Sequence, residues 1–362
     1  MKRIYAGLAA LPLGIGMAQT AAAEDGFRFY GFVNPAIVSF DDGATTTTEF
    51  ADSSHAPSRI GIWWERPMSS ATFKFNFETA LGFRGTSSIS QTTTPDIWDW
   101  DKTKLRKIDA IFETSTAGTF SVGQGSMATD GVTNSDLSGT SLTTYNAIGD
   151  SAGGFFFRTS GGALSTVKVG SVYPNFDGSR KGRLRYDSPD LGGLTLSASV
   201  GTEILSSGND DVLYDVAARY AREFGSMKYV ASAGVLWNDM DGGGTTHQYA
   251  GTFSALHMPS GFNVTVAAGQ NSADASYIYG KLGVRRDFFA FGTTSIAVDY
   301  YMGQDNVSAG DESDAVGIGI VQEIDSADLE VYFGFRQYGY ADTTATTYQD
   351  ANSYLFGARW KF

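Results

Sequence analysis

The stretch TFKFNFETALGFR at residues 72–84 alternates between two kinds of side chain and decides the fold. Its odd-numbered positions from Phe73 to Leu81 are mostly aromatic or aliphatic, and the even-numbered positions between them are Lys, Asn, Glu and Ala. A period of two is the pattern of a β-strand with one apolar and one polar face. Because a strand of a soluble sandwich also alternates, this stretch becomes decisive only together with others like it.

The same alternation recurs along the chain in runs of about ten residues, for example from Leu194, from Ile296 and from Leu329. The polar faces hold Gly, Ser, Thr, Asn and Tyr with a few charges, whereas a soluble exterior would be rich in Lys and Glu. This composition suits a water-filled lumen, and Tyr, Phe and Trp bound the apolar faces as girdles do at membrane interfaces. The pattern therefore predicts an all-β transmembrane antiparallel barrel.

Composition narrows the function classes. The 362 residues include 44 Gly, 8 Pro and no Cys, and 26 basic against 39 acidic residues give a net charge of -13. Without Cys the chain forms no disulfide scaffold, thiolate zinc site or Cys nucleophile. Its acidity argues against a nucleic-acid partner, which would require a basic face. No helical stretch approaches the roughly 18 consecutive apolar residues that a membrane helix requires.

The first segment predicts the compartment. Residues 1–23 begin with Lys2 and Arg3, continue through a mostly apolar stretch, and end in three alanines at 21–23. This is the pattern of a secretory signal peptide removed after Ala23, since the apolar run is too short for a membrane anchor. No linker divides the rest, so we expect residues 24–362 to form a single barrel domain in a bacterial envelope.

Connector lengths predict the number of strands. Short connectors rich in Pro, Gly, Ser and Asp suit tight hairpins, and they lie at 66–69, 188–193, 224–226, 258–261 and 325–327. Longer polar connectors alternate with them at 41–57, 85–103, 239–245, 304–313 and 339–351. Short turns in the periplasm and long loops outside are typical of outer-membrane barrels. The pattern predicts 16 strands with both termini in the periplasm.

The predicted strands are 27–40, 58–67, 71–84, 104–115, 118–125, 182–189, 194–203, 211–223, 227–238, 246–258, 262–270, 275–288, 293–303, 314–325, 328–338 and 352–362. The segment 155–172 offers a further hairpin and an alternative of 18 strands. Three consecutive Phe residues and the breaks at Gly161 and Pro174 favour leaving it inside one long loop, 126–181.

These segments resemble the general porins of Gram-negative outer membranes, in their alphaproteobacterial form. The resemblance covers the whole mature chain and is clearest in Phe27–Phe32, in residues 182–199 and in Tyr354–Phe362. It implies a homotrimer of barrels in the outer membrane, next to lipid and lipopolysaccharide, with each barrel passing ions and small hydrophilic solutes by passive diffusion. It also implies that the aromatic C-terminal residue, Phe362, is the assembly signal.

The resemblance further implies a constriction, formed where a long external loop folds into the lumen and faces a basic cluster on the wall. Loop 126–157 contains no Lys or Arg. Opposite charges at a narrow point orient dipolar solutes and set ion preference. The candidates on the acidic side are Asp130, Asp136 and Asp150, and those on the basic side are Arg59, Lys74, Arg84, Lys107, Arg183 and Arg185. Among these, Lys74 and Arg84 are also compatible with positions near a mouth of the channel.

Two other channel hypotheses stay open. Four tyrosines on predicted lumen faces suggest a substrate-specific channel, for example for sugars: Tyr277, Tyr279, Tyr301 and Tyr332. A structural or adhesive barrel with a plugged lumen would show the same alternation.

Metal and enzyme functions have weaker support. No cofactor is expected, although the acidic pairs Asp41–Asp42, Asp210–Asp211 and Asp239 with Asp241 offer oxygen ligands to Ca²⁺; none has EF-hand spacing, so a solvated acidic rim is favoured. The three histidines are scattered, and no hydrolase, zinc-protease or phosphate-loop motif occurs. His257 near Ser254 and Ser260 is the single candidate for a hydrolytic pair, so we predict that the protein is not an enzyme.

Overall fold

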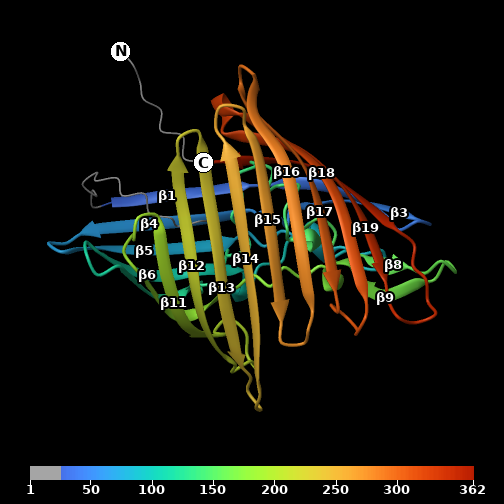
Figure 1. The fold of residues 1–362 in the computed structure, drawn as a ribbon, viewed down its shortest axis with the longest axis horizontal. Helices are drawn as coiled ribbons and strands as arrows, with labels where there is room; N and C mark the ends of the chain where they lie inside the picture. The colour runs from blue at the N-terminus through green and yellow to red at the C-terminus, as the bar shows by residue number, and fades with distance from the viewer. Residues whose placement is uncertain (1–25) are drawn as a thin grey trace.

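The computed structural model describes residues 26–362, and the signal peptide predicted at 1–23 lies outside them. The described chain forms one closed antiparallel β-barrel (Figure 1). Its sheet has 18 strands. However, β1 and β2 together form one crossing of the wall, and β3 and β4 together form the next. The chain therefore crosses the wall 16 times, as the sequence predicts.

The wall strands, in chain order, are β1 (Gly26–Val33), β2 (Pro35–Asp41), β3 (Thr46–Asp52), β4 (Arg59–Pro67), β5 (Ala71–Ala80), β6 (Leu105–Thr114), β7 (Thr119–Ser126), β10 (Arg180–Asp187), β11 (Leu194–Thr202), β12 (Val212–Phe224), β13 (Met227–Asp239), β14 (Thr245–His257), β15 (Phe262–Asn271), β16 (Ser276–Phe289), β17 (Gly292–Gln304), β18 (Glu312–Ile324), β19 (Leu329–Ala341) and β20 (Ala351–Lys361).

The segment 155–172 does not join the wall. It forms β8 (Phe156–Arg158) and β9 (Leu164–Lys168), which pair only with each other, followed by the one-turn helix α1 (Val169–Val172). The alternative with two further wall strands is therefore not the arrangement observed. The remaining helices are single 3₁₀ turns at Thr86–Ser88, Lys102–Lys104, Ile148–Asp150 and Asp325–Ala327. No helix within residues 26–362 is long and apolar enough to cross a membrane.

The last strand closes the barrel. β20 pairs with the end of β1, where Val33 faces Trp360, and then along β2 as far as Asp41. Beyond β20, Phe362 exchanges two backbone hydrogen bonds with Gly31, at 3.0 and 3.1 Å. Closure leaves no unpaired strand edge in the wall that residues 26–362 form, which is the condition for crossing lipid with strands.

The prediction of an external loop at residues 41–57 is partly wrong. The sequence assigns 41–57 to a loop, but Thr46–Asp52 forms β3 and pairs with β2 in register from Asp41 opposite Thr46. Thr and Phe favour strands, and they outweigh the polar character of this stretch. The connection between β2 and β3 is therefore a tight turn, in which Asp42 N donates to Thr45 O at 3.1 Å.

The alternation of side chains gives the two faces as predicted. On β17, Val298 is 48% exposed on the outside and its neighbour Asp299 is 3% exposed on the inside. On β19, Phe333 and Tyr332 divide in the same way, at 41% and 1%. The apolar outer face is the one that meets lipid.

The connections also divide by length. All five predicted short turns, and those between β6 and β7 and between β16 and β17, lie at the end of the barrel that holds Gly26 and Phe362. The longest connections, at 81–104 and 127–179, lie at the opposite end. Short periplasmic turns and long external loops place both ends of the described chain on the periplasmic side.

Candidate channel constriction

The longest connection, residues 127–179, folds back into the barrel along the inner wall. The backbone N–H of Thr129 donates to Asp215 Oδ2 on β12 at 2.7 Å. Farther along, the N–H of Leu137 donates to Ser254 Oγ on β14 at 3.2 Å. The loop thus runs along the inner wall past one strand after another. Its hydrogen bonds to the wall begin at β11 and end at β19.

A buried ion pair fixes the middle of the loop. Lys281 Nζ on β16 lies 2.6 Å from Asp136 Oδ2 and also donates to Thr144 O at 3.0 Å. The side chains of Lys281 and Asp136 are 1% and 8% exposed. Asp136, predicted for the acidic side of the constriction, is therefore bound to the wall beneath the loop and away from open water.

Aromatic contacts hold the far end of the loop. Tyr173 Oη donates to Asp314 O and Gly339 O, at 2.8 and 2.7 Å. The ring of Phe155 stacks on that of Phe40, with centroids 4.3 Å apart. This apolar cluster between loop and wall is the part of the molecule most like the core of a soluble domain.

The four predicted lumen tyrosines lie on the inner face, but they are buried. Tyr277 and Tyr301 stack with centroids 5.3 Å apart, and Tyr301 Oη donates to Pro174 O of the loop at 2.6 Å. Tyr279 donates to Asp299 at 2.9 Å, and Tyr332 donates to Asn34 at 2.7 Å. All four are at most 5% exposed, so they do not form an open aromatic track.

A set of basic side chains gathers on the inner faces of β4, β6, β10 and β12, which we call the basic wall. Its seven members are Arg59, Arg106, Lys107, Arg180, Arg183, Arg185 and Arg219. Four of the six basic residues predicted for the constriction belong to it, and Arg106, Arg180 and Arg219 are additions that the sequence analysis missed.

A single carboxylate serves two of these arginines. Glu78 Oε1 on β5 accepts from Arg106 Nε at 2.6 Å and lies 3.7 Å from Arg59 Nη1. Glu78 is also the acceptor for Tyr30 Oη at 3.0 Å. A β-bulge between Glu78 and Thr79 disturbs the alternation on β6, so that Arg106 and its neighbour Lys107 are both directed inward.

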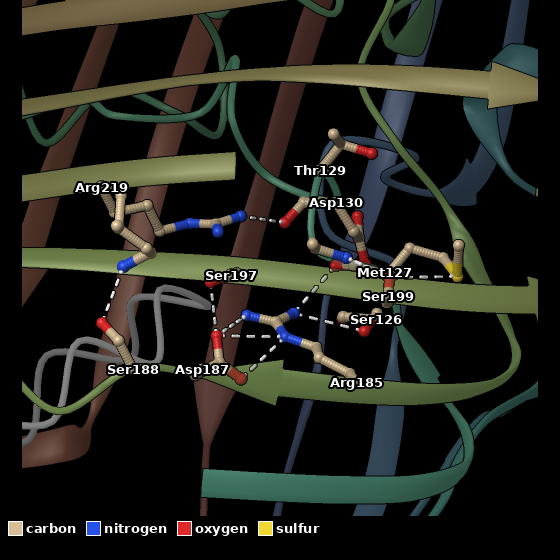
Figure 2. A network of polar contacts seen from close by, with 12 residues as sticks. Ser126, Met127, Thr129, Asp130, Arg185, Asp187, Ser188, Ser197, Ser199 and Arg219 are labelled. Carbon is tan, nitrogen blue, oxygen red and sulfur yellow. Dashed lines mark hydrogen bonds and ion pairs between the residues drawn. The ribbon is translucent and has the colours of Figure 1, made fainter. Parts of the chain in front are cut away.

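Arg183 and Arg185 are each held by a carboxylate. Arg183 binds both oxygens of Asp109 at 2.9 and 2.7 Å and is 3% exposed. Arg185 binds Asp187 at 2.7 Å and donates to the carbonyl oxygens of Ser126 and Met127, at 3.2 and 2.8 Å (Figure 2). These contacts fix the guanidinium groups at the point where the loop leaves β7.

Asp130 of the loop meets the basic wall. Its Oδ2 lies 3.4 Å from Arg180 Nη1. Its backbone oxygen accepts from Arg219 Nη2 at 2.9 Å (Figure 2). Of the three predicted acidic residues, Asp130 is therefore the one that contacts the basic side directly.

Asp150 lies elsewhere along the loop, away from the basic wall. It lines an open cavity of about 370 Å³ together with Ser87, Tyr173 and Asn175. Burial raises the pKa of Asp150 to about 7. Burial, followed by repulsion from Asp130, likewise raises the pKa of the loop residue Asp177 to about 7. Both carboxyl groups therefore change charge near neutral pH.

Lys74 and Arg84 lie apart from this zone. Lys74 is near the periplasmic end of β5, where its Nζ lies 2.5 Å from Glu113 Oε2. Arg84 follows the external end of β5, pairs with Glu49 at 3.0 Å and donates to Phe50 O. The structure thus places these two residues near the mouths, the alternative position that the sequence allows.

The acidic loops show no metal site. Asp42 is occupied by Arg158, whose Nη2 lies 2.7 Å from Asp42 Oδ2. Asp211 accepts from Asn238 and from the N–H of Asp241, at 3.0 and 2.9 Å. Among residues 26–362 no group of three or more His, Asp or Glu side chains lies close enough to hold a metal ion. Ca²⁺ binding stays a prediction.

A closed barrel with an apolar exterior, a charged interior and a long loop folded inside defines a transmembrane channel of the outer membrane. The chain belongs to the Gram-negative porin family, whose sequence profile matches residues 7–362. It is therefore a multi-pass outer-membrane protein and a channel for the passive diffusion of small solutes.

Solved porin structures share the fold. The anion-selective porin of Comamonas acidovorans is 13% identical, with a TM-score of 0.63 over 94% of this chain and 100% of that one. Salmonella typhi OmpF, in a complex with daunomycin, is 13% identical, with a TM-score of 0.59 over 93% and 98%. The trimer form of Vibrio cholerae OmpT is 15% identical, with a TM-score of 0.55 over 94% and 100%. No curated protein matches the sequence.

Proposed function

We propose that this porin is a general diffusion channel whose narrow zone lies between loop 127–179 and the basic wall. The observation that carries the proposal is the contact of Asp130 with Arg180 and Arg219, which brings the acidic loop against the basic wall inside the lumen. Opposite charges across a narrow channel create a transverse field, which orients dipolar solutes and weights the passage of ions.

Planar-bilayer recording tests this function. A general channel gives a current that rises linearly with voltage and with salt concentration, with weak selectivity among small solutes. A protein that inserts but does not conduct would instead support the plugged structural barrel, and saturable transport of one solute alone would support the substrate-specific channel.

The structure weakens the main support for a sugar-specific channel. That hypothesis requires aromatic faces exposed along the lumen, but Tyr301 and Tyr332 are 0% and 1% exposed. Their hydroxyl groups are engaged by Pro174 O and Asn34 respectively. Passing solutes therefore meet charged and small polar side chains instead of stacked rings.

A hydrolytic function has little support in the geometry. His257 Nδ1 lies 2.7 Å from Ser260 Oγ, but the two residues are three apart and span a periplasmic turn. Ser254 is fully buried on the inner face and bonds to Thr265 at 2.8 Å. We therefore propose a channel without catalytic activity.

A homotrimer is the proposed assembly. Support comes from the trimer form of the structurally similar Vibrio cholerae OmpT and from the broad apolar outer face of the barrel. Cross-linking in lipid and counting of conductance steps measure the state directly, because a trimer inserts as three equal conducting units. Single, independent steps together with a monomeric mass would reject the trimer.

A further inference from the structure

We propose that the constriction prefers anions and holds solutes that carry phosphate or carboxylate groups at Arg106, Lys107 and Arg219. The inference deepens the proposed function and rests on it, since it assigns a solute class to the same narrow zone. Net charge gives the opposite expectation, because the chain as a whole carries -13. What decides the matter is which charges in the narrow zone already have partners.

The carboxylates of the zone are fewer than its cations and are already engaged. The seven cations of the basic wall face six carboxylates, those of Glu78, Asp109, Asp130, Asp177, Asp187 and Asp215. Asp177 and Asp215 are engaged by backbone N–H groups of the loop, those of Gly131 and Thr129. Asp109 and Asp187 are each held by one arginine through two or more hydrogen bonds. Glu78 serves both Arg59 and Arg106, so this pair keeps an excess of one positive charge.

Lys107 is a second cation of the zone without a carboxylate partner of its own among the described residues. Within residues 26–362 no hydrogen bond or ion pair joins its ammonium group to a carboxylate. The bulge on β6 places it beside Arg106, whose own carboxylate is shared. Two adjacent cations with one shared acid make a site that a further anion would complete.

Arg219 supplies the third charge and an unused donor. Its Nη2 donates to the backbone oxygen of Asp130 at 2.9 Å, which is a neutral acceptor. The residue is 8% exposed, and its Nη1 is buried without a hydrogen-bond partner within the described chain. A buried guanidinium donor without an acceptor is costly, and an anion oxygen in the channel would satisfy it.

Arg106 and Arg219 keep their charge while the protein is folded, because guanidinium groups do not deprotonate in proteins. A channel lined by charges of one sign between low-dielectric walls raises the local concentration of the opposite ion. Arginine also binds carboxylate and phosphate through two parallel hydrogen bonds, which gives these groups an advantage over chloride. Small phosphorylated or carboxylated solutes are therefore the class that the zone fits.

Bilayer recordings of the full-length channel in a KCl gradient test the sign. We expect chloride to permeate more readily than potassium, and the Lys107→Gln variant to lower that preference about twofold or more. Lys107→Gln breaks no ion pair of the described chain, so folding should be kept, and an unchanged midpoint of urea unfolding in lipid vesicles confirms that it is. Arg222→Gln is the matched control, because Arg222 lies on β12 near the periplasmic turn and donates to Gly192 O at 2.8 Å.

Inorganic pyrophosphate tests the binding site. We expect it to reduce the chloride current in a saturable way, and the Lys107→Gln and Arg219→Gln variants to need several times more pyrophosphate for the same reduction. Cation preference in the unmodified channel, or equal block in Arg222→Gln and the two site variants, would overturn the inference while leaving the general channel intact. Absence of any conductance would reject the proposed function instead.

Discussion

The Lys281→Met variant tests whether a buried charge pair fixes the loop to the wall. Methionine keeps the length and the apolar stem of the lysine, but it leaves the Asp136 carboxylate without its cation in a site that is 8% exposed. Removing one partner of a buried ion pair costs about 3–5 kcal/mol. Because Ser138 and Thr265 still donate to Asp136, at 2.8 and 3.2 Å, we expect the lower end of that range, about 3 kcal/mol.

Part of this cost is relieved if the segment around Asp136 and Thr144 moves off the wall, because the carboxylate then regains water. Loop movement changes the open space in the lumen, so the variant should have a more variable single-channel conductance than the unmodified protein. Urea unfolding in lipid vesicles measures the loss of stability, and bilayer recording measures the spread of conductance.

Lys228→Met is the matched control. Lys228 lies 3.5 Å from Glu223, and the two side chains are 31% and 52% exposed, so removing that pair costs about 0–1 kcal/mol. The double variant Lys281→Met/Asp136→Leu should recover much of the loss, since an apolar replacement of both partners is often neutral. If Lys281→Met unfolds and conducts like the unmodified protein, the pair does not anchor the loop.

Three further predictions concern other parts of the barrel. Burial raises the pKa of Asp150 to about 7, so its carboxyl is neutral below that pH and charged above it. Cation permeability should therefore rise from about pH 6 to pH 8, and it should rise less in the Asp150→Asn variant. Equal pH profiles of the two proteins would contradict this prediction. Gly123→Ala should lower the free energy of unfolding in urea by about 1–3 kcal/mol, because φ of Gly123 is 123° and an added Cβ would lie 2.1 Å from Ile108 O. Gly280→Ala is the control and should leave the free energy of unfolding unchanged, because an added Cβ there meets no atom within 4 Å. Deleting Phe362 should lower the yield of folded barrel in the membrane fraction, and an undiminished yield would remove this residue as the assembly signal.

The strands could be predicted from the sequence because the two faces of each strand have different surroundings, and this difference appears as a regular alternation of residue types. Where one face meets lipid and the other meets water, the side chains alternate, as they do around Asp299 and Tyr332. This alternation is missing at β3, Thr46–Asp52, because threonines lie on both faces and neither face is distinctly apolar. Polarity alone then resembles a loop, although the backbone pairs with β2.

The inward direction of Arg106 could not be predicted from alternation. Lys107 and Arg106 are neighbours, so a regular strand directs one of them to the lipid. A bulge opposite Glu78 changes the register by one residue, and only the backbone pairing of β5 and β6 reveals it. The one signal available was energetic, because two adjacent charges on a spanning strand imply an irregularity that keeps both out of lipid.

The course of the constriction loop was also beyond the sequence. Its existence and its limits were predicted, 126–181 against the observed 127–179. Its path depends on partners such as Lys281 and Asp136, which are 145 residues apart. Such pairs leave no local pattern, so a carboxylate that anchors the loop and one that faces the channel look alike in the sequence.

The order of these contacts along the chain has a consequence for biogenesis. The loop is synthesised before the strands that hold its far end, since Tyr173 is bound by Asp314 on β18 and Gly339 on β19. Contacts between distant parts of a chain form late and slowly. The diameter of the pore is therefore established only after the last strands have joined, and an incompletely closed barrel would be a wide, unfiltered leak in the outer membrane.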